Sequence, residues 1–202
     1  MAGNIPSNLK AIDGKPLSPE AERALDYLRT RPAGLNVAGV RERVRAAALE
    51  LEKLVDGVPE NEARERPIAG KWNIAEVVDH IAQTQIRAVE ELRHLLAGRR
   101  PPGPPVYGGL RTGAPDCVSW PELVDGLRSA NQALVELLAE APGAAEEAGA
   151  TARTILVVNG QTFSVDLDWK QYALVQRLHL LEHRTQVKKL LEALASGPAH
   201  PS

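Results

Sequence analysis

Two histidines on the longest expected helix are spaced so that they could share a metal ion. His179 and His183 stand four residues apart within 169–195. Because four residues make about one helical turn, both imidazoles lie on one face, close enough to hold one ion. The stripe that carries them, from Tyr172 to Leu190, is apolar at its ends and polar in its middle. Buried polar groups need partners, and one metal ion would satisfy two imidazoles at once.

A third histidine comes from another expected helix. His80 lies in 74–96, beside the apolar stripe that contains Val77. In a helical bundle this helix can face His179 and His183. Three histidines leave at least one coordination position open, which is typical of a catalytic metal site, and bundle cores often hold such sites. The spacing alone leaves an alternative, in which all three are hydrogen-bonded core residues.

The other two histidines and the single cysteine are expected to lie outside the site. His94 has Glu90 and Glu91 as neighbours and is expected on the surface, and His200 falls in a Gly/Pro-containing tail that we expect to be disordered. Cys117 lies in a loop just before a helix cap. It could supply a fourth ligand, but an ordinary thiol is the favoured interpretation.

The composition restricts the class of protein. The chain has 202 residues, and its 24 Lys and Arg against 26 Asp and Glu give a net charge of −2, so no basic surface favours nucleic acid. One cysteine excludes an intramolecular disulfide framework and a Cys-rich zinc module, and it fits a reducing cytoplasm. The core must be aliphatic, because only seven residues are Phe, Trp or Tyr.

The sequence also predicts no membrane partner. The N-terminal stretch has no apolar segment typical of a secretory signal, and no run approaches the length of a spanning helix. The first residues do not match a myristoylation signal either. We therefore expect a cytoplasmic protein.

Stretches without proline beyond their first turn predict the helices that must position the histidines. Apolar residues recur with helical spacing in four long stretches, and a shorter one precedes them: 36–56, 74–96, 119–141, 169–195 and 19–29. Three of the long helices have a capping residue followed three positions later by Glu or Gln, in the pairs Asn73 and Glu76, Ser119 and Glu122, and Asp168 and Gln171.

Two segments break the helical pattern. Residues 154–166 carry β-branched residues around Asn159-Gly160, which predicts a β-hairpin with a type I′ turn, packed on the helices. Residues 98–116 are rich in proline and glycine. They predict a spacer that crosses the end of the bundle, with a flap over the site as the alternative.

The predicted fold is therefore all-α. A four-helix bundle occupies 35–197, with the small β-hairpin before its last helix. An N-terminal extension, 1–34, carries the short helix, and residues 198–202 form a flexible tail.

Two motifs resemble those of DinB/YfiT-like proteins. The segment Trp72-Asn-Ile-Ala-Glu-Val-Val-Asp-His80 is similar to the second-helix signature of the family, and His179-Leu-Leu-Glu-His183-Arg-Thr-Gln186 resembles its H-x-x-x-H-R-x-Q motif on the last helix. The resemblance covers about 35–196. The extension before it is a departure from the family, and no role can be assigned to it from the sequence.

The resemblance implies an up-down-down-up four-helix bundle in which His80, His179 and His183 bind one divalent ion, commonly zinc or nickel. Family members include metal hydrolases and transferases that use low-molecular-weight thiols such as bacillithiol or mycothiol. The family often pairs its bundles, which implies a homodimer. DNA polymerase activity is not implied.

The leading hypothesis is a metal-dependent enzyme that acts on a small molecule, with hydrolysis and thiol transfer both open because no carboxylate is clearly placed as a general base. The rivals are a bundle that binds a metal or small molecule without turnover and a structural, dimerising bundle. Polar residues near the histidines in sequence are candidates to accept the other imidazole N–H, namely Glu76, Asp79, Gln176, Glu182 and Gln186.

Overall fold

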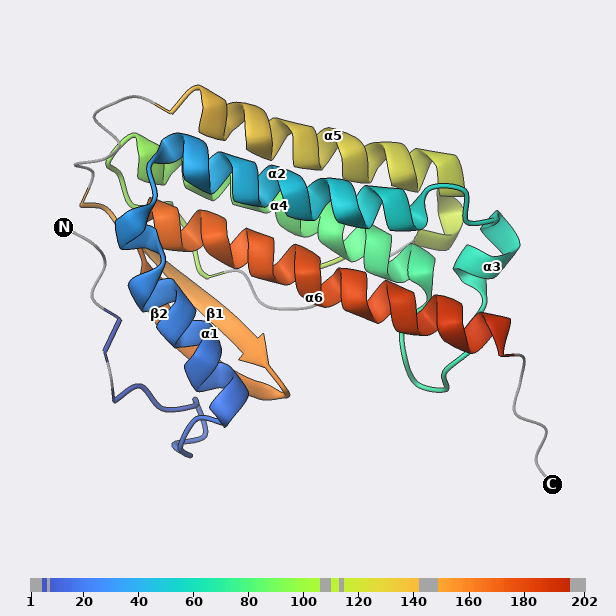
Figure 1. Ribbon diagram of the computed structural model, residues 1–202, viewed down its shortest axis with the longest axis horizontal. Coiled ribbons are helices and arrows are strands. Elements are labelled where there is room, and N and C mark those ends of the chain that lie inside the picture. The colour runs from blue at the N-terminus through green and yellow to red at the C-terminus, as the bar shows by residue number, and fades with distance from the viewer. Residues whose placement is uncertain (1–4, 7, 106–109, 113–114, 142–148, 197–202) are drawn as a thin grey trace.

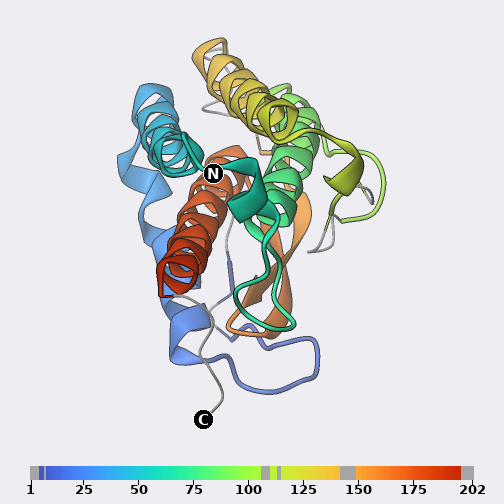
Figure 2. The ribbon, with the colours of Figure 1, turned by 90° about the vertical axis from the view of Figure 1, so that its right-hand side faces the viewer.

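The protein is built around four long helices. The computed structural model describes residues 5–6, 8–105, 110–112, 115–141 and 149–196. The long helices are α2 (Val37–Val55), α4 (Ile74–Leu96), α5 (Trp120–Ala139) and α6 (Trp169–Ala195). Helix α2 packs against α5 and α6, and α4 packs against the same two helices (Figure 1). Figure 2 shows the four helices from one end. The predicted helices are confirmed, with small differences at their ends.

The three predicted capping boxes explain where α4, α5 and α6 begin. Asn73 accepts a hydrogen bond from the Glu76 backbone N–H, and the Glu76 side chain accepts one from the Asn73 N–H. The same reciprocal pairing occurs at the start of α5 and of α6. Each box satisfies backbone N–H groups that have no partner within the helix.

The core is aliphatic, as predicted, and it is divided into two apolar clusters. Along α4 the change from one cluster to the other falls between Ala82 and Ala88. Buried polar residues lie at this division, with Gln85 on α4, Asn131 on α5 and Gln176 on α6. Neither polar atom of the Gln85 amide has a hydrogen-bond partner among the described residues.

The predicted hairpin is present directly before α6. Strands β1 (Ala152–Val158) and β2 (Gln161–Leu167) pair antiparallel, with Val158 opposite Gln161. Both turn residues have positive φ, 48° at Asn159 and 75° at Gly160, which is the conformation that a type I′ turn requires. Phe163 from β2 is fully buried against the helices.

The N-terminal extension is part of the folded unit. Its helix α1 (Pro19–Thr30) buries Leu25 and Leu28 in the same apolar cluster as the hairpin. The Ile12 N–H donates a 2.7 Å hydrogen bond to the Thr162 carbonyl at the outer edge of β2. The sequence predicted this helix but not its docking on the hairpin.

The structure also contains three short elements that the sequence did not predict. Helix α3 (Glu60–Arg64) and the 3₁₀ turns Pro32–Gly34 and Pro115–Cys117 occupy segments next to prolines. They are too short to display an apolar period. The tail at 198–202, with His200, lies outside the described residues. In the part of the chain that is described, no helix combines the length and apolarity that a membrane span needs.

We expect Leu28→Ala to destabilise the protein by about 2–5 kcal/mol, because it opens a cavity where α1 meets the core. Chemical denaturation measures this loss. Leu49→Ala is the matched control, since Leu49 is 39% exposed, and a change within about 0.5 kcal/mol is expected there. Equal stability of the two variants would mean that α1 is not part of the cooperative core.

Candidate metal centre

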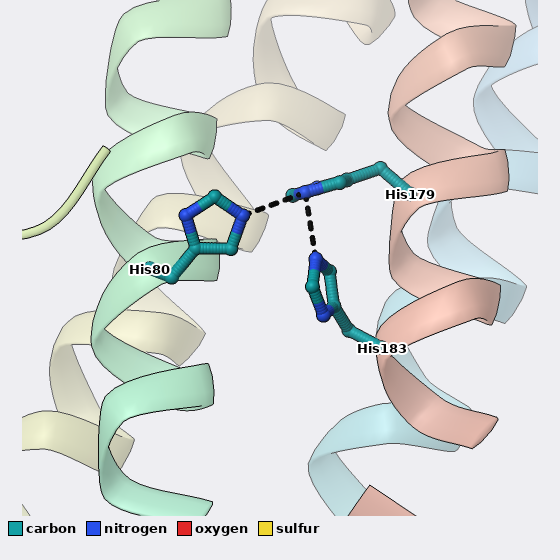
Figure 3. A group of neighbouring side chains, drawn as sticks. All are labelled: His80, His179 and His183. Carbon is teal, nitrogen blue, oxygen red and sulfur yellow. Dashed lines mark hydrogen bonds between the residues drawn. The ribbon is translucent and has the colours of Figure 1, made fainter. Parts of the chain in front are cut away.

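Three imidazole rings meet where α4 packs against α6. His80 comes from α4, and His179 and His183 come from α6 (Figure 3). The Nε2 atom of His179 lies 3.0 Å from that of His80 and 2.9 Å from that of His183. One nitrogen from each ring lies within 4.8 Å of the other two, so the three could hold one metal ion. The structure thus brings together all three histidines that the sequence singled out.

Hydrogen bonds at the far side of two rings fix their tautomers. His80 Nδ1 lies 2.7 Å from the Leu110 carbonyl oxygen, and His183 Nδ1 lies 2.8 Å from Gln186 Oε1. Both oxygens only accept, so both Nδ1 atoms carry the proton and donate. In the neutral rings, Nε2 of His80 and Nε2 of His183 then present lone pairs toward His179.

The surroundings keep these rings neutral. Burial lowers the pKa of His80 below its ordinary value. Burial, reinforced by the two neighbouring imidazoles, places the pKa of His179 well below the ordinary range. Burial and the neighbouring His80 lower the pKa of His183 to about 4, although its hydrogen bond to Gln186 acts in the opposite direction. At neutral pH the rings are therefore uncharged ligands.

A cation fits this arrangement better than hydrogen bonding does. If His179 carries its proton on Nε2, it can donate to only one of the two lone pairs that face it. If the proton is on Nδ1, three lone pairs converge, and Nδ1 itself is buried without a partner among the described residues. In both tautomers at least one lone pair is left without a donor, and a divalent ion is the partner that satisfies all three rings.

The crossover between α4 and α5 clamps the first of these ligands. The Leu110 carbonyl accepts from His80, and two residues later Thr112 donates from both its N–H and its hydroxyl to Asp79. The N–H to Oδ2 distance is 2.9 Å, and Asp79 is 1% exposed. The clamp at 110–112 is therefore anchored on the residue next to His80. The predicted spacer contacts the site directly at this point.

A second anchor of the clamp is ionic. Arg111 donates to Glu76 at 3.0 Å, and its guanidinium lies 4.8 Å from the centre of the Trp72 ring. Arg66 pairs with the same Glu76 oxygen at 2.9 Å. Burial acts to raise the pKa of Glu76, but Arg66, the Asn73 N–H and Arg111 outweigh it and hold that pKa below its ordinary value. Glu76 therefore stays charged while it caps α4 and holds the clamp.

The candidates for orienting the imidazoles divide into three groups. Gln186 contacts His183 as predicted. Glu76 and Asp79 act indirectly, because their hydrogen bonds go to the clamp and the helix cap rather than to a ring. Gln176 and Glu182 line the adjacent cavity. The Leu110 carbonyl was missed, since a backbone acceptor has no signature in the sequence.

A cavity of about 710 Å³ opens beside the histidines. Its walls come from α1, α4, the β-hairpin and α6, and most of the wall surface is apolar. It continues along α6 from His183 to Tyr172, which is about 16 Å at the rise of an α-helix. At that end the Tyr172 hydroxyl donates to Glu91 at 2.6 Å, and burial, followed by the Glu91 charge, raises the pKa of Tyr172 well above its ordinary value.

The remaining candidate ligands lie elsewhere. Cys117 is exposed and is not part of the three-histidine group. His94 sits in the last turn of α4, also outside that group. Both placements agree with the sequence-based expectation.

Comparison with known proteins assigns the chain to a family but finds no individual protein that it matches. A family model described as the DinB superfamily matches residues 42–165. The matched region contains His80 and ends before α6, so the structure itself brings His179 and His183 to the site. Neither a curated protein nor a solved structure gives a significant match.

The clamp predicts an effect of Asp79 on metal affinity. Asp79→Ala removes the acceptor for Thr112 and frees Leu110 from His80, so zinc affinity should fall by about 10–100-fold, as for other groups that orient metal ligands. Competition with a chromophoric chelator measures this. The matched control is Asp125→Ala on the exposed face of α5, which should leave the affinity unchanged. Equal affinities in the two variants would contradict a role for the clamp.

The lowered pKa values predict that acid destabilises the metal-free protein. The unfolded chain takes up protons near pH 6.5, whereas folded His183 takes one up only near pH 4, so the unfolded state binds more protons between these values. The free energy of unfolding therefore falls as the pH drops through this window, by about 3 kcal/mol from His183.

Urea unfolding in the presence of a chelator, at several pH values, tests this. His183→Gln is the comparison that removes the contribution of carboxylates elsewhere, and its stability should depend less on pH between 6.5 and 4. Parallel curves for the two proteins would contradict the pKa assignment.

Proposed function

Because the chain belongs to the DinB superfamily, we propose that it is a divalent-metal-dependent hydrolase that acts on a small molecule through His80, His179 and His183. The observation that carries this proposal is the convergence of three neutral imidazoles whose Nε2 atoms have no complete set of hydrogen bonds. The cavity beside them supplies room for a substrate.

The chain's own groups hold the ligands in place. The Leu110 carbonyl and Gln186 accept the Nδ1 protons of His80 and His183, which leaves Nε2 of both rings free to bind an ion. A bound divalent ion supplies Lewis acidity, which polarises a carbonyl group or acidifies water. Aliphatic side chains around the cavity exclude solvent from the reacting groups.

Hydrolysis accounts for the cavity better than thiol transfer does. The polar thiols used in this family would need hydrogen-bonding or charged groups that are free to hold them. The arginines on the cavity wall are engaged, since Arg87 pairs with Glu90 and Glu91, and Arg153 pairs with Asp166. The single thiol of the chain, Cys117, is not among the lining residues.

The finer points of fold and metal are also proposals. We propose the up-down-down-up arrangement of the four helices, which the helix pairs and the course of the colours along α2, α4, α5 and α6 in Figure 1 support. Zinc and nickel both accept imidazole ligands, and we propose one of them as the ion. The homodimer and the cytoplasmic location stay predictions.

Metal analysis tests the proposed site. After dialysis against zinc or nickel, the protein should carry one ion per chain, and its melting temperature should rise. His183→Ala should abolish stoichiometric binding while helix content by circular dichroism is kept. His94→Ala is the matched control on α4 and should bind normally. The site would be refuted by wild-type protein without stoichiometric metal or by His183→Ala that still binds one ion.

A substrate screen then tests the reaction. We expect the metal-loaded protein to cleave uncharged amides or esters, to lose this activity with a chelator and to regain it when the metal is restored. Activity that survives the chelator would contradict a metal-dependent hydrolase. Turnover that requires an added low-molecular-weight thiol would favour the transferase instead.

A further inference from the structure

The cavity lies along the edge of strand β1. Every residue of 153–158 contributes to the cavity wall. Side chains of a strand alternate between its two faces, so one face alone would contribute only every second residue. An uninterrupted series therefore indicates that the cavity runs along the edge of β1 that faces away from β2. An edge of this kind presents backbone groups as well as side chains.

The hairpin register identifies these backbone groups. With a two-residue turn, Val158 and Gln161 form a hydrogen-bonded pair, and such pairs recur at every second residue. The N–H and C=O groups of Arg153, Ile155 and Val157 then point away from β2. The other edge follows the same rule, because the outward carbonyl of Thr162 accepts from Ile12. No described backbone group outside the hairpin pairs with Ile155 or Val157.

The charged side chains of the cavity wall disfavour an anionic ligand, because its two arginines are paired and its remaining acidic residue, Glu182, would repel an anion. Arg153 makes two hydrogen bonds to Asp166, at 2.8 and 2.7 Å, and Arg87 is paired with Glu91 at 3.2 Å. Because both arginines are already paired with carboxylates, neither needs an anionic ligand to balance its charge. The surface of the wall is mostly apolar, and Leu28, Leu156 and Leu178 contribute to it.

The dimensions suit a short extended chain. The stretch 153–158 spans about 17 Å at the rise of a strand, so it can pair with about five residues of a second strand. The histidines line the same cavity. Amide groups that reach β1 would thus lie in one enclosure with the candidate metal ligands.

From these observations we infer that the cavity binds a short, neutral, apolar peptide in extended form, which adds to β1 as a third strand. Backbone hydrogen bonds to Ile155 and Val157 hold the peptide, and the aliphatic wall receives its side chains. Such a peptide would be the substrate of the proposed hydrolase. Only the cleavage of its amide bond rests on that proposed function. Binding to β1 is a property of the hairpin edge itself.

Amide hydrogen exchange, followed by NMR, tests the binding mode directly. The probe is a blocked, uncharged pentapeptide of leucine, valine and alanine, added to ¹⁵N-labelled full-length protein. We expect slower hydrogen exchange at the outward N–H groups of Ile155 and Val157, with little change at Thr154 and Leu156, which already pair with β2. The same peptide with its alternate backbone amides methylated keeps its side chains but cannot pair as a strand, and it should bind at least about fivefold more weakly.

A matched pair of variants separates backbone pairing from side-chain contact. Ile155→Pro removes one outward N–H without taking a bond from the β1–β2 ladder, whereas Ile155→Ala shortens the side chain and keeps the N–H. The proline variant should bind the peptide at least about fivefold more weakly than the alanine variant. Unchanged exchange at Phe163 and Val165 verifies that the hairpin remains folded.

Each titration is run on metal-loaded and on chelator-treated protein, so that the two proposals can fail independently. Peptide binding at β1 in a protein that takes up no stoichiometric zinc or nickel on dialysis would refute the hydrolase and support the strand site. Stoichiometric metal with equal binding of the methylated peptide, equal binding by both variants, or no protection at Ile155 and Val157 would overturn the strand site.

Discussion

The structure depends on bringing three imidazole nitrogens from two helices to one point. His179 and His183 share a face of α6, but His80 reaches them only if α4 packs against α6 in one register. A shift of α4 by a single residue would turn His80 away by more than a quarter of a helical turn. The capping boxes that fix the starts of α4 and α6 therefore also fix the geometry of the site.

Burying so many polar groups is costly unless each has a partner. Around His80 this condition is met by the clamp, because the Leu110 carbonyl, Asp79 and Glu76 are all engaged through residues 110–112. Around His179 it is not met, since its Nδ1 has no described partner and its Nε2 faces two lone pairs. His179, which lines the cavity, is therefore the ring whose hydrogen bonds are incomplete.

Local signals explain what could be predicted from the sequence. Capping pairs, the Asn159-Gly160 turn and the spacing of His179 and His183 act within a few residues, so the long helices, the hairpin and this pair of histidines followed from them. His80 was joined to the pair by the resemblance to a family, because it lies on another helix. The Leu110 carbonyl could not be predicted, because every residue has a carbonyl and only the path of the crossover selects this one. The docking of α1 on the hairpin could not be predicted either, because an apolar helix face does not specify which element it packs against.

The division of the core explains why a cavity can exist at this place. An uninterrupted aliphatic core closes around any space it leaves, because its side chains gain contacts by filling it. Here α4 and α6 change from one apolar cluster to the other at Gln85 and Gln176, so the aliphatic packing is interrupted at this level of the bundle. The hairpin has only two strands, so the edge of β1 is left to form one wall of the cavity that Gln176 also lines. The metal ligands, Gln176 from this junction and strand β1 thus line the same cavity.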